Sequence, residues 1–135
     1  MKLFNLFNRS ARRDAPTVPE RPVFVREYQN SSTFRGMHRL PISLYGDDEA
    51  VRNCMDILGD EDEHMCKGQT ITLAGFRFDG GTGIKVSVDG SPVGVVWEQI
   101  EDAYYESAYS GDIGGVFVRL SRDPDGSCRG NLFVK

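Results

Sequence analysis

The stretch from Gln69 to Trp97 constrains the fold most, because it holds three β-rich runs separated by glycine turns. In the first run, Ile71 and Leu73 alternate with threonines, and over 84–88 isoleucine and valines alternate with polar residues. A period of two places alternate side chains on opposite faces of a sheet. Asp89-Gly90 joins the second and third runs, and both residue types tolerate the positive φ of a tight hairpin turn. The sequence therefore predicts an antiparallel meander, with a looser glycine turn at 80–83.

Four further strands are expected on either side of the meander. They cover residues 23–28, 34–45, 114–121 and 131–135, where apolar and polar residues again alternate. Pro41 has no N–H to donate to a sheet ladder. The strand that contains Pro41 should therefore lie at a sheet edge or carry a bulge.

Two helices are predicted. Asp47 is a suitable N-cap for a helix over 47–58, whose apolar stripe would be Val51, Cys54, Met55 and Leu58. A second helix is expected over 98–109, ending near Gly111. The acidic run at 60–63, which follows the first helix, is interpreted as a solvated loop because it lacks the spaced ligands of a calcium site.

These elements indicate a mainly β domain over residues 22–135. The expected architecture is a small OB-like or SH3-like, partly open barrel of about five to seven antiparallel strands with two helices. Residues 1–21 are predicted to form a flexible basic tail. Within it, Leu3, Phe4 and Phe7 can share one helical face, which fits either a short docking helix or a frayed terminus.

Charge is unevenly distributed along the chain. Residues 1–21 carry five basic and two acidic side chains, a net +3, and the remainder carries eleven basic and eighteen acidic side chains, a net −7. An acidic domain disfavours strong non-specific binding to phosphate backbones. Three cysteines without CxxC spacing and the lack of a signal peptide indicate reduced thiols in a cytoplasmic protein. No apolar run approaches the length of a membrane span.

No group of residues predicts catalysis, a cofactor or a metal site. His64-Met65-Cys66 lacks the second ligand pair of a structural zinc site. The glycines at 80–83 join two strands and do not open a helix, which argues against a phosphate cradle. Cys66, beside Lys67, is the more reactive thiol candidate, but no nucleophile, base and orienting group fall together in sequence. We therefore expect a protein that is not an enzyme and binds no cofactor or metal.

Nucleic acid is the ligand class that the residues allow. Phe76, Arg77 and Phe78 interleave aromatic and basic side chains on one strand, as in proteins that stack single-stranded bases. The candidate contacts are Arg35, His38, Arg39, Arg77, Lys85 and Trp97. Alternation places Phe76 and Phe78 on the face opposite Arg77, and this split favours core positions for the two phenylalanines.

The segment 84–96, Ile-Lys-Val-Ser-Val-Asp-Gly-Ser-Pro-Val-Gly-Val-Val, resembles the HIRAN family. Members of that family carry Ala-Ile-x-Val, a turn, and then Ile/Val-Gly-Tyr-Val. The opening Met-Lys-Leu-Phe-Asn-Leu-Phe and the run Gly-Gly-Val-Phe at 114–117 look like small stand-alone bacterial members. The resemblance implies an OB-like barrel that binds single-stranded DNA, in some eukaryotic remodelling enzymes by capturing a free 3′ end.

The resemblance also adds Asp79 to the candidate contacts, since this residue stands where the family has an aspartate. Around it, residues 76–83 lack the asparagine, tyrosine and alanine of the family pattern Glu-Pro-x-Asn-Pro-Tyr-Asp-x-Asn-Ala. Two hypotheses follow. The chain is a non-catalytic module that binds single-stranded DNA weakly, with or without preference for a 3′ end, or a protein-interaction module that has lost the DNA site.

Overall fold

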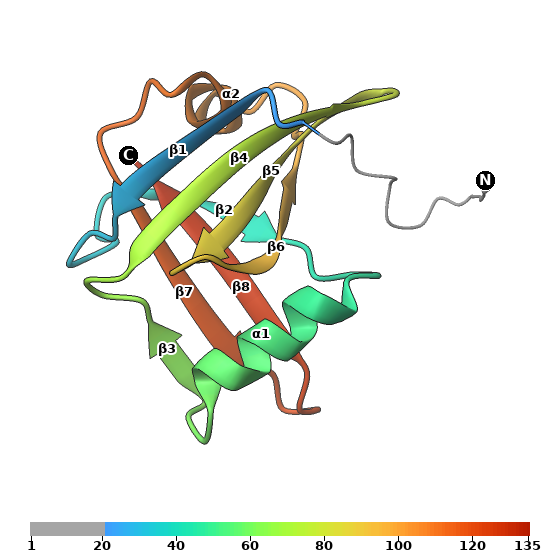
Figure 1. Cartoon of the computed structure of the whole chain (residues 1–135). Helices are drawn as coiled ribbons and strands as arrows, with labels where there is room; N and C mark the ends of the chain where they lie inside the picture. The colour runs from blue at the N-terminus through green and yellow to red at the C-terminus, as the bar shows by residue number, and fades with distance from the viewer. Residues whose placement is uncertain (1–20) are drawn as a thin grey trace.

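The computed structural model describes residues 21–135, which form eight strands and two helices (Figure 1). The strands are β1 Phe24–Gln29, β2 His38–Ile42, β3 Glu63–Met65, β4 Thr70–Phe78, β5 Gly81–Val88, β6 Ser91–Trp97, β7 Val116–Arg122 and β8 Cys128–Val134. The helices are α1 Asp48–Leu58 and α2 Ala103–Ser110. The predicted mainly β fold with two helices is confirmed, although the expected number of strands was too low.

The strands form two antiparallel sheets of four strands each. Sheet A has the order β1-β4-β5-β6, and sheet B has the order β2-β8-β7-β3. The sheets face each other and do not close into one barrel. Figure 1 shows α2 at one end of the two sheets and α1 at the other. Side chains from both sheets and both helices meet in one hydrophobic cluster, to which α1 contributes Cys54 and Leu58 and α2 contributes Tyr105 and Ala108.

The predicted meander is confirmed as β4-β5-β6, the larger part of sheet A. Asp89 and Gly90 have φ of 49° and 86°, as the hairpin turn requires. The turn between β4 and β5 is tighter than predicted, because only Asp79 and Gly80 lie outside the strands. Gly81 and Gly83 belong to β5, where their lack of a side chain leaves room for neighbouring groups.

One margin between the sheets is closed by a buried polar side chain, Asn30, which is 5% exposed. Its Nδ2 donates to the carbonyl of Cys66 at 2.6 Å, and its Oδ1 accepts from the N–H of Val118 at 3.0 Å. Its backbone N–H donates to Gln69 O at 3.0 Å, and the next residue donates to Val116 O at 2.9 Å. Asn30 therefore joins the start of β4 to β7 of the other sheet.

The opposite margin is closed by a single bridge between Ser43 and Val95. Their backbone groups exchange two hydrogen bonds, at 2.7 and 3.0 Å. The adjacent Gly94 has φ of 134°, and a Cβ there would lie 2.6 Å from both Ile42 Cγ2 and Ser43 O. Only glycine lets β6 approach β2 this closely.

Helix α1 begins as predicted, since Asp47 Oδ1 accepts from the N–H of Ala50 at 3.0 Å. The predicted apolar stripe was wrong in part, because Val51 and Met55 are exposed and Ala50 is buried beside Cys54 and Leu58. The helix therefore turns a slightly different face toward the sheets than residue hydrophobicity suggests.

Helix α2 begins at Ala103, later than the predicted Glu98. Glu101 has φ of 64°, outside helical values, and Asp102 is the N-cap. At the other end, Arg26 of β1 donates to the carbonyls of Tyr109 and Ser110 at 3.0 and 3.1 Å. These bonds satisfy carbonyl groups in the last turn, which have no partner within the helix.

Strand β2 lies at an edge of sheet B, as the proline at position 41 requires. Its extent is shorter than the predicted 34–45. Strand β3 was not predicted, because its first residue belongs to the acidic run interpreted as a loop. It pairs with β7, and Glu63 forms an ion pair with Arg119.

The predicted tail lies outside the described residues except for Arg21. Across residues 21–135, neither helix has the length and apolar character needed to span a membrane.

We expect Gly94→Ala to lower the free energy of unfolding by about 3 kcal/mol or more, combining backbone strain with overpacking. Urea denaturation would measure the change. Gly90→Ala is the matched control, because Gly90 also has a positive φ but a Cβ added there would meet no heavy atom within 4 Å. Gly90→Ala should lower the free energy of unfolding by about 1 kcal/mol. Equal losses in the two variants would contradict the role of Gly94 at the margin.

Candidate nucleic-acid interface

An aromatic platform lies on the outer face of sheet A, formed by Phe76, Phe78 and Trp97. In the sheet register, Phe76 lies opposite Gly83, and Gly83 lies opposite Trp97. The ring centroids of Phe78 and Trp97 are 5.2 Å apart, and those of Phe76 and Phe78 are 6.4 Å apart. Such spacing is typical of favourable aromatic contacts. Three rings from β4 and β6, the two strands that flank β5, therefore form a continuous apolar surface.

The platform corrects the expectation that Phe78 belongs to the core, whereas Phe76 is buried as expected but on the outer side of sheet A, outside the main hydrophobic cluster. The inward positions of β4 are taken by Ile71 and Leu73, so alternation turns both phenylalanines to the outside. Phe76 is only 8% exposed, whereas Trp97 is 36% exposed. Trp97 is thus the ring most available to a ligand, with half-buried Phe78 beside it.

Gly83 makes the platform possible. A Cβ at this position would lie 3.1 Å from the Trp97 ring and 3.2 Å from the Phe78 ring. Without that atom, both rings can lie over the backbone of β5. A ligand that stacks on them would then approach the middle strands of the sheet.

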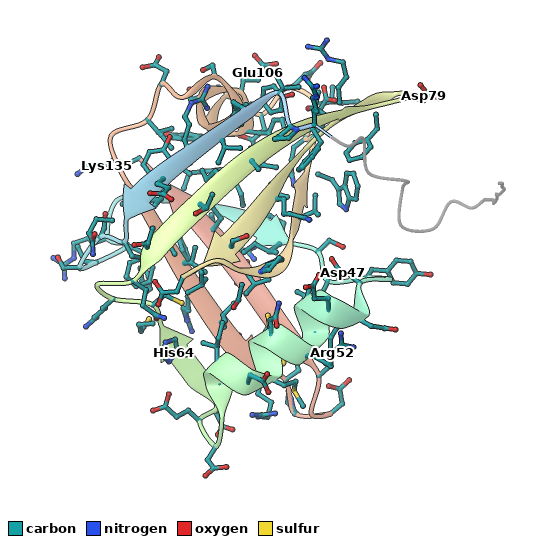
Figure 2. All side chains as sticks on the ribbon, viewed as in Figure 1. Asp47, Arg52, His64, Asp79, Glu106 and Lys135 are labelled. Carbon is teal, nitrogen blue, oxygen red and sulfur yellow. The ribbon has the colours of Figure 1, made fainter. Side chains whose placement is uncertain are left out.

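Lys85 brings a positive charge to the platform. Its ammonium lies 5.9 Å from the centroid of the Phe76 ring, within the range of a cation–π contact. Arg77 projects to the opposite face of β4, where it is exposed near the end of the strand. Figure 2 shows Asp79 at the far tip of the β4–β5 hairpin. Four of the seven predicted residues therefore lie on sheet A, with Lys85 and Trp97 on its outer face and Arg77 and Asp79 at or near the β4–β5 turn.

The other three predicted residues lie elsewhere. Arg39 is on the outer face of sheet B, where its Nη1 donates to Asn131 Oδ1 at 3.2 Å. Arg35 is exposed in the loop before β2. Since Lys85 and Arg39 occupy the outer faces of opposite sheets, one short strand cannot contact both. The seven predicted contact residues therefore do not form a single surface.

His38 lies in a third location, where it contacts the start of α2. Its ring stacks on Tyr104 with centroids 4.2 Å apart, and its Nε2 lies 3.3 Å from Asp102 Oδ2. The other oxygen of Asp102 accepts from the N–H groups of Tyr104 and Tyr105. His38 therefore positions Asp102, the N-cap residue of α2.

Sequence reasoning did not identify a second aromatic cluster, on the outer face of sheet B. Phe34 stacks on Phe133 at 4.8 Å and meets Phe117 edge-on at 5.2 Å. The Arg119 guanidinium lies 5.7 Å from the Phe34 centroid. Apolar residues occur at consecutive positions in 116–118 and 132–134, which could have indicated strands covered on both faces. Because Phe34 covers the other two rings, they offer little surface to a ligand.

Cys54 and Cys66 are both buried and lack the exposure of reactive thiols. Burial raises the pKa of Cys66 to about 12 and that of Cys54 to about 12. A thiol with such a pKa is protonated at neutral pH and is a poor nucleophile. Within residues 21–135 no three His, Cys, Asp or Glu side chains gather in a way that could hold a metal ion.

No protein-family model, curated protein or solved structure matches this chain. The functional interpretation therefore depends on the chemistry of the platform.

The cap of α2 should give the protein a pH-dependent stability. Although desolvation opposes ionisation, hydrogen bonds from Tyr105, Tyr104 and His38 lower the pKa of Asp102. A carboxylate with a lowered pKa stabilises the fold above its unfolded pKa of about 4, and this contribution is lost as the pH falls through the folded value. We expect Asp102→Ala to lower the free energy of unfolding by about 1 kcal/mol at pH 7 and by less at pH 3, as measured by urea unfolding.

Asp112→Ala is the control, because Asp112 is exposed and lies beyond the last turn of α2. Its free energy of unfolding should stay close to that of the wild type at both pH values. A cost of Asp102→Ala that is the same at pH 7 and pH 3 would show that the carboxylate charge is unimportant.

Proposed function

We propose that the protein is a non-catalytic module that binds single-stranded nucleic acid weakly on the platform of sheet A. The observation that carries the proposal is the pair formed by half-buried Phe78 and exposed Trp97, with ring centroids 5.2 Å apart and Lys85 nearby. Bases stack on such rings, each contact contributing about 1–3 kcal/mol, and a neighbouring cation attracts the phosphates. An OB-like fold of HIRAN type is the finer structural assignment that accompanies this proposal.

Charge supports weak binding. The platform itself carries one cation, Lys85, and the acidic side chains of Asp79 and Glu98 are exposed nearby at the ends of β4 and β6. Few phosphates can be neutralised there, so affinity should come mainly from stacking. The salt dependence should be shallow, with a slope of about −0.7 for each phosphate contacted on a single strand.

A protein-interaction module is the second candidate function. The observation in its favour is the exposure of two apolar residues on the edge strand β1 and just before it, Val25 at 58% and Val23 at 51%. Exposed apolar side chains beside an unpaired strand edge are a common means of contact between proteins. A protein partner held in this way would bind without a strongly salt-dependent electrostatic contribution.

Binding is tested by fluorescence anisotropy of a labelled 15-mer oligothymidylate at low salt, with the full chain. Trp97→Ala should weaken binding about tenfold, the effect of losing one stacked base. Lys85→Ala should weaken it by a smaller factor and flatten the salt dependence. Circular dichroism would verify that the variants are folded.

Arg39→Ala is the matched control for Lys85→Ala, since it removes a cation from the outer face of the other sheet. It should leave the dissociation constant within about twofold of the wild type, as expected for a surface residue that contacts no ligand. Unchanged affinity in Trp97→Ala would contradict the proposed platform. No binding at low salt would favour the protein-interaction module.

Recognition of a strand end is tested separately with an oligonucleotide that carries a 3′ phosphate. Arg77 and Asp79 lie at the end of sheet A, where a strand crossing the platform would leave it. A free 3′ end that binds more tightly than the blocked end, with the difference lost in Arg77→Ala, would establish end recognition. Equal binding of both oligonucleotides would show a general single-strand surface.

A further inference from the structure

The platform is part of a larger apolar area on the outer face of sheet A. One row across the sheet runs from Val23 through Phe76 and Gly83 to Trp97, and the next runs from Val25 through Ala74 and Lys85 to Val95. With Phe78, these rows make an area that is apolar except for Lys85. We call it the sheet A face. Exposed apolar areas of this kind usually bind a partner.

We propose that the segment Leu3-Phe4-Asn5-Leu6-Phe7 of the same chain docks on the sheet A face. The chain enters sheet A beside this face. The N–H of Val23 donates to Gly75 O at 2.6 Å, which fixes the residues just before β1 beside the row that contains Phe76 and Trp97. Any segment preceding Arg21 is therefore tethered at the margin of the apolar area.

The length of the tether allows the contact. Residues 8–20 separate Phe7 from the start of the described chain, and that many residues can span about 40 Å when extended. Four strands at about 4.8 Å spacing make the face about 15 Å wide. The segment can therefore reach every part of the face, including Trp97 on the far edge strand.

The chemistry of the two partners is complementary. Four of the five residues in the segment are leucine or phenylalanine, and they match the valines and aromatic rings of the sheet A face. The tether carries Arg9, Arg12 and Arg13. Exposed carboxylates lie around the face, on Glu27 of β1, Asp79 of the hairpin and Glu98 after β6. Attraction between these charges would favour docking over release.

Tethering also favours this segment over a second copy of the chain. A short tether gives an effective concentration in the mM range, so a contact with an intrinsic dissociation constant of about 0.1 mM would be about 90% formed. A second copy at micromolar concentration would have to bind far more tightly to compete. The docked segment would cover the rings that the proposed function assigns to nucleic acid.

Trp97 is the only tryptophan of the chain, so its fluorescence reports on the face directly. In the triple variant Leu3→Ser, Phe4→Ser, Phe7→Ser, acrylamide should quench Trp97 about twofold more strongly than in the wild type, because the docked fraction is lost. The emission should also shift to longer wavelength. The control Asn5→Ser, Asn8→Ser changes the same segment but keeps its apolar residues, and should behave as the wild type.

A second variant changes the face and leaves the segment intact. Val25→Ser removes an exposed apolar side chain, so it should increase quenching in the wild-type background and add nothing to the triple variant. Equal quenching of the wild type and the triple variant would overturn the proposal. Protection that appears only as concentration rises, together with a doubled mass in sedimentation, would also overturn it and identify a second copy as the occupant.

The quenching experiment needs no nucleic acid, so it is independent of the proposed function. If both proposals hold, the triple variant should bind the 15-mer oligothymidylate more tightly than the wild type, by up to about tenfold for a contact that is 90% formed. Protection of Trp97 from quenching, with no nucleic-acid binding by either the wild type or the triple variant, would support the docking and reject the nucleic-acid platform.

Discussion

The two sheets depend on the buried amide of Asn30. A polar side chain with 5% exposure is costly to bury unless its donors and acceptors are paired, and here both ends of the amide are bonded. The partners come from different parts of the chain, at Cys66 before β4 and Val118 in β7. No apolar side chain could make these bonds, so the amide fixes the relative position of the sheets more specifically than packing alone.

This constraint explains how a platform can form on the outside of the molecule. Asn30 and the core below it determine which face of β4 points inward, and alternation then turns Phe76 and Phe78 outward. Gly83 completes the arrangement by leaving space over β5 for the rings. The site is thus a consequence of sheet orientation, and its residues need no loop to hold them.

Features determined by neighbours in sequence were predicted from the sequence, whereas features determined by distant partners were not. The hairpin at Asp89-Gly90 and the N-cap at Asp47 need only a few adjacent residues. Strand β3 forms because β7 pairs with it, and that pairing leaves no local signal in an acidic run. The candidate site was predicted only in part, because some of its predicted residues are close in sequence and others are brought to their positions by distant strand pairing. Lys85 and Trp97 lie in strands of one meander, whereas Arg39 lies in a strand that pairs with β8 of the other sheet.

The two margins between the sheets differ in the number of bonds that close them. Asn30 and its neighbour supply side-chain and backbone bonds at one margin, whereas Ser43 and Val95 supply two backbone bonds at the other. Regions with fewer bonds open more readily in native proteins. The two sheets should therefore separate more readily where β2 meets β6, with the margin at Asn30 acting as the hinge. Trp97 is the last residue of β6. Movement of β6 away from β2 would therefore change the orientation of the platform to which a ligand binds.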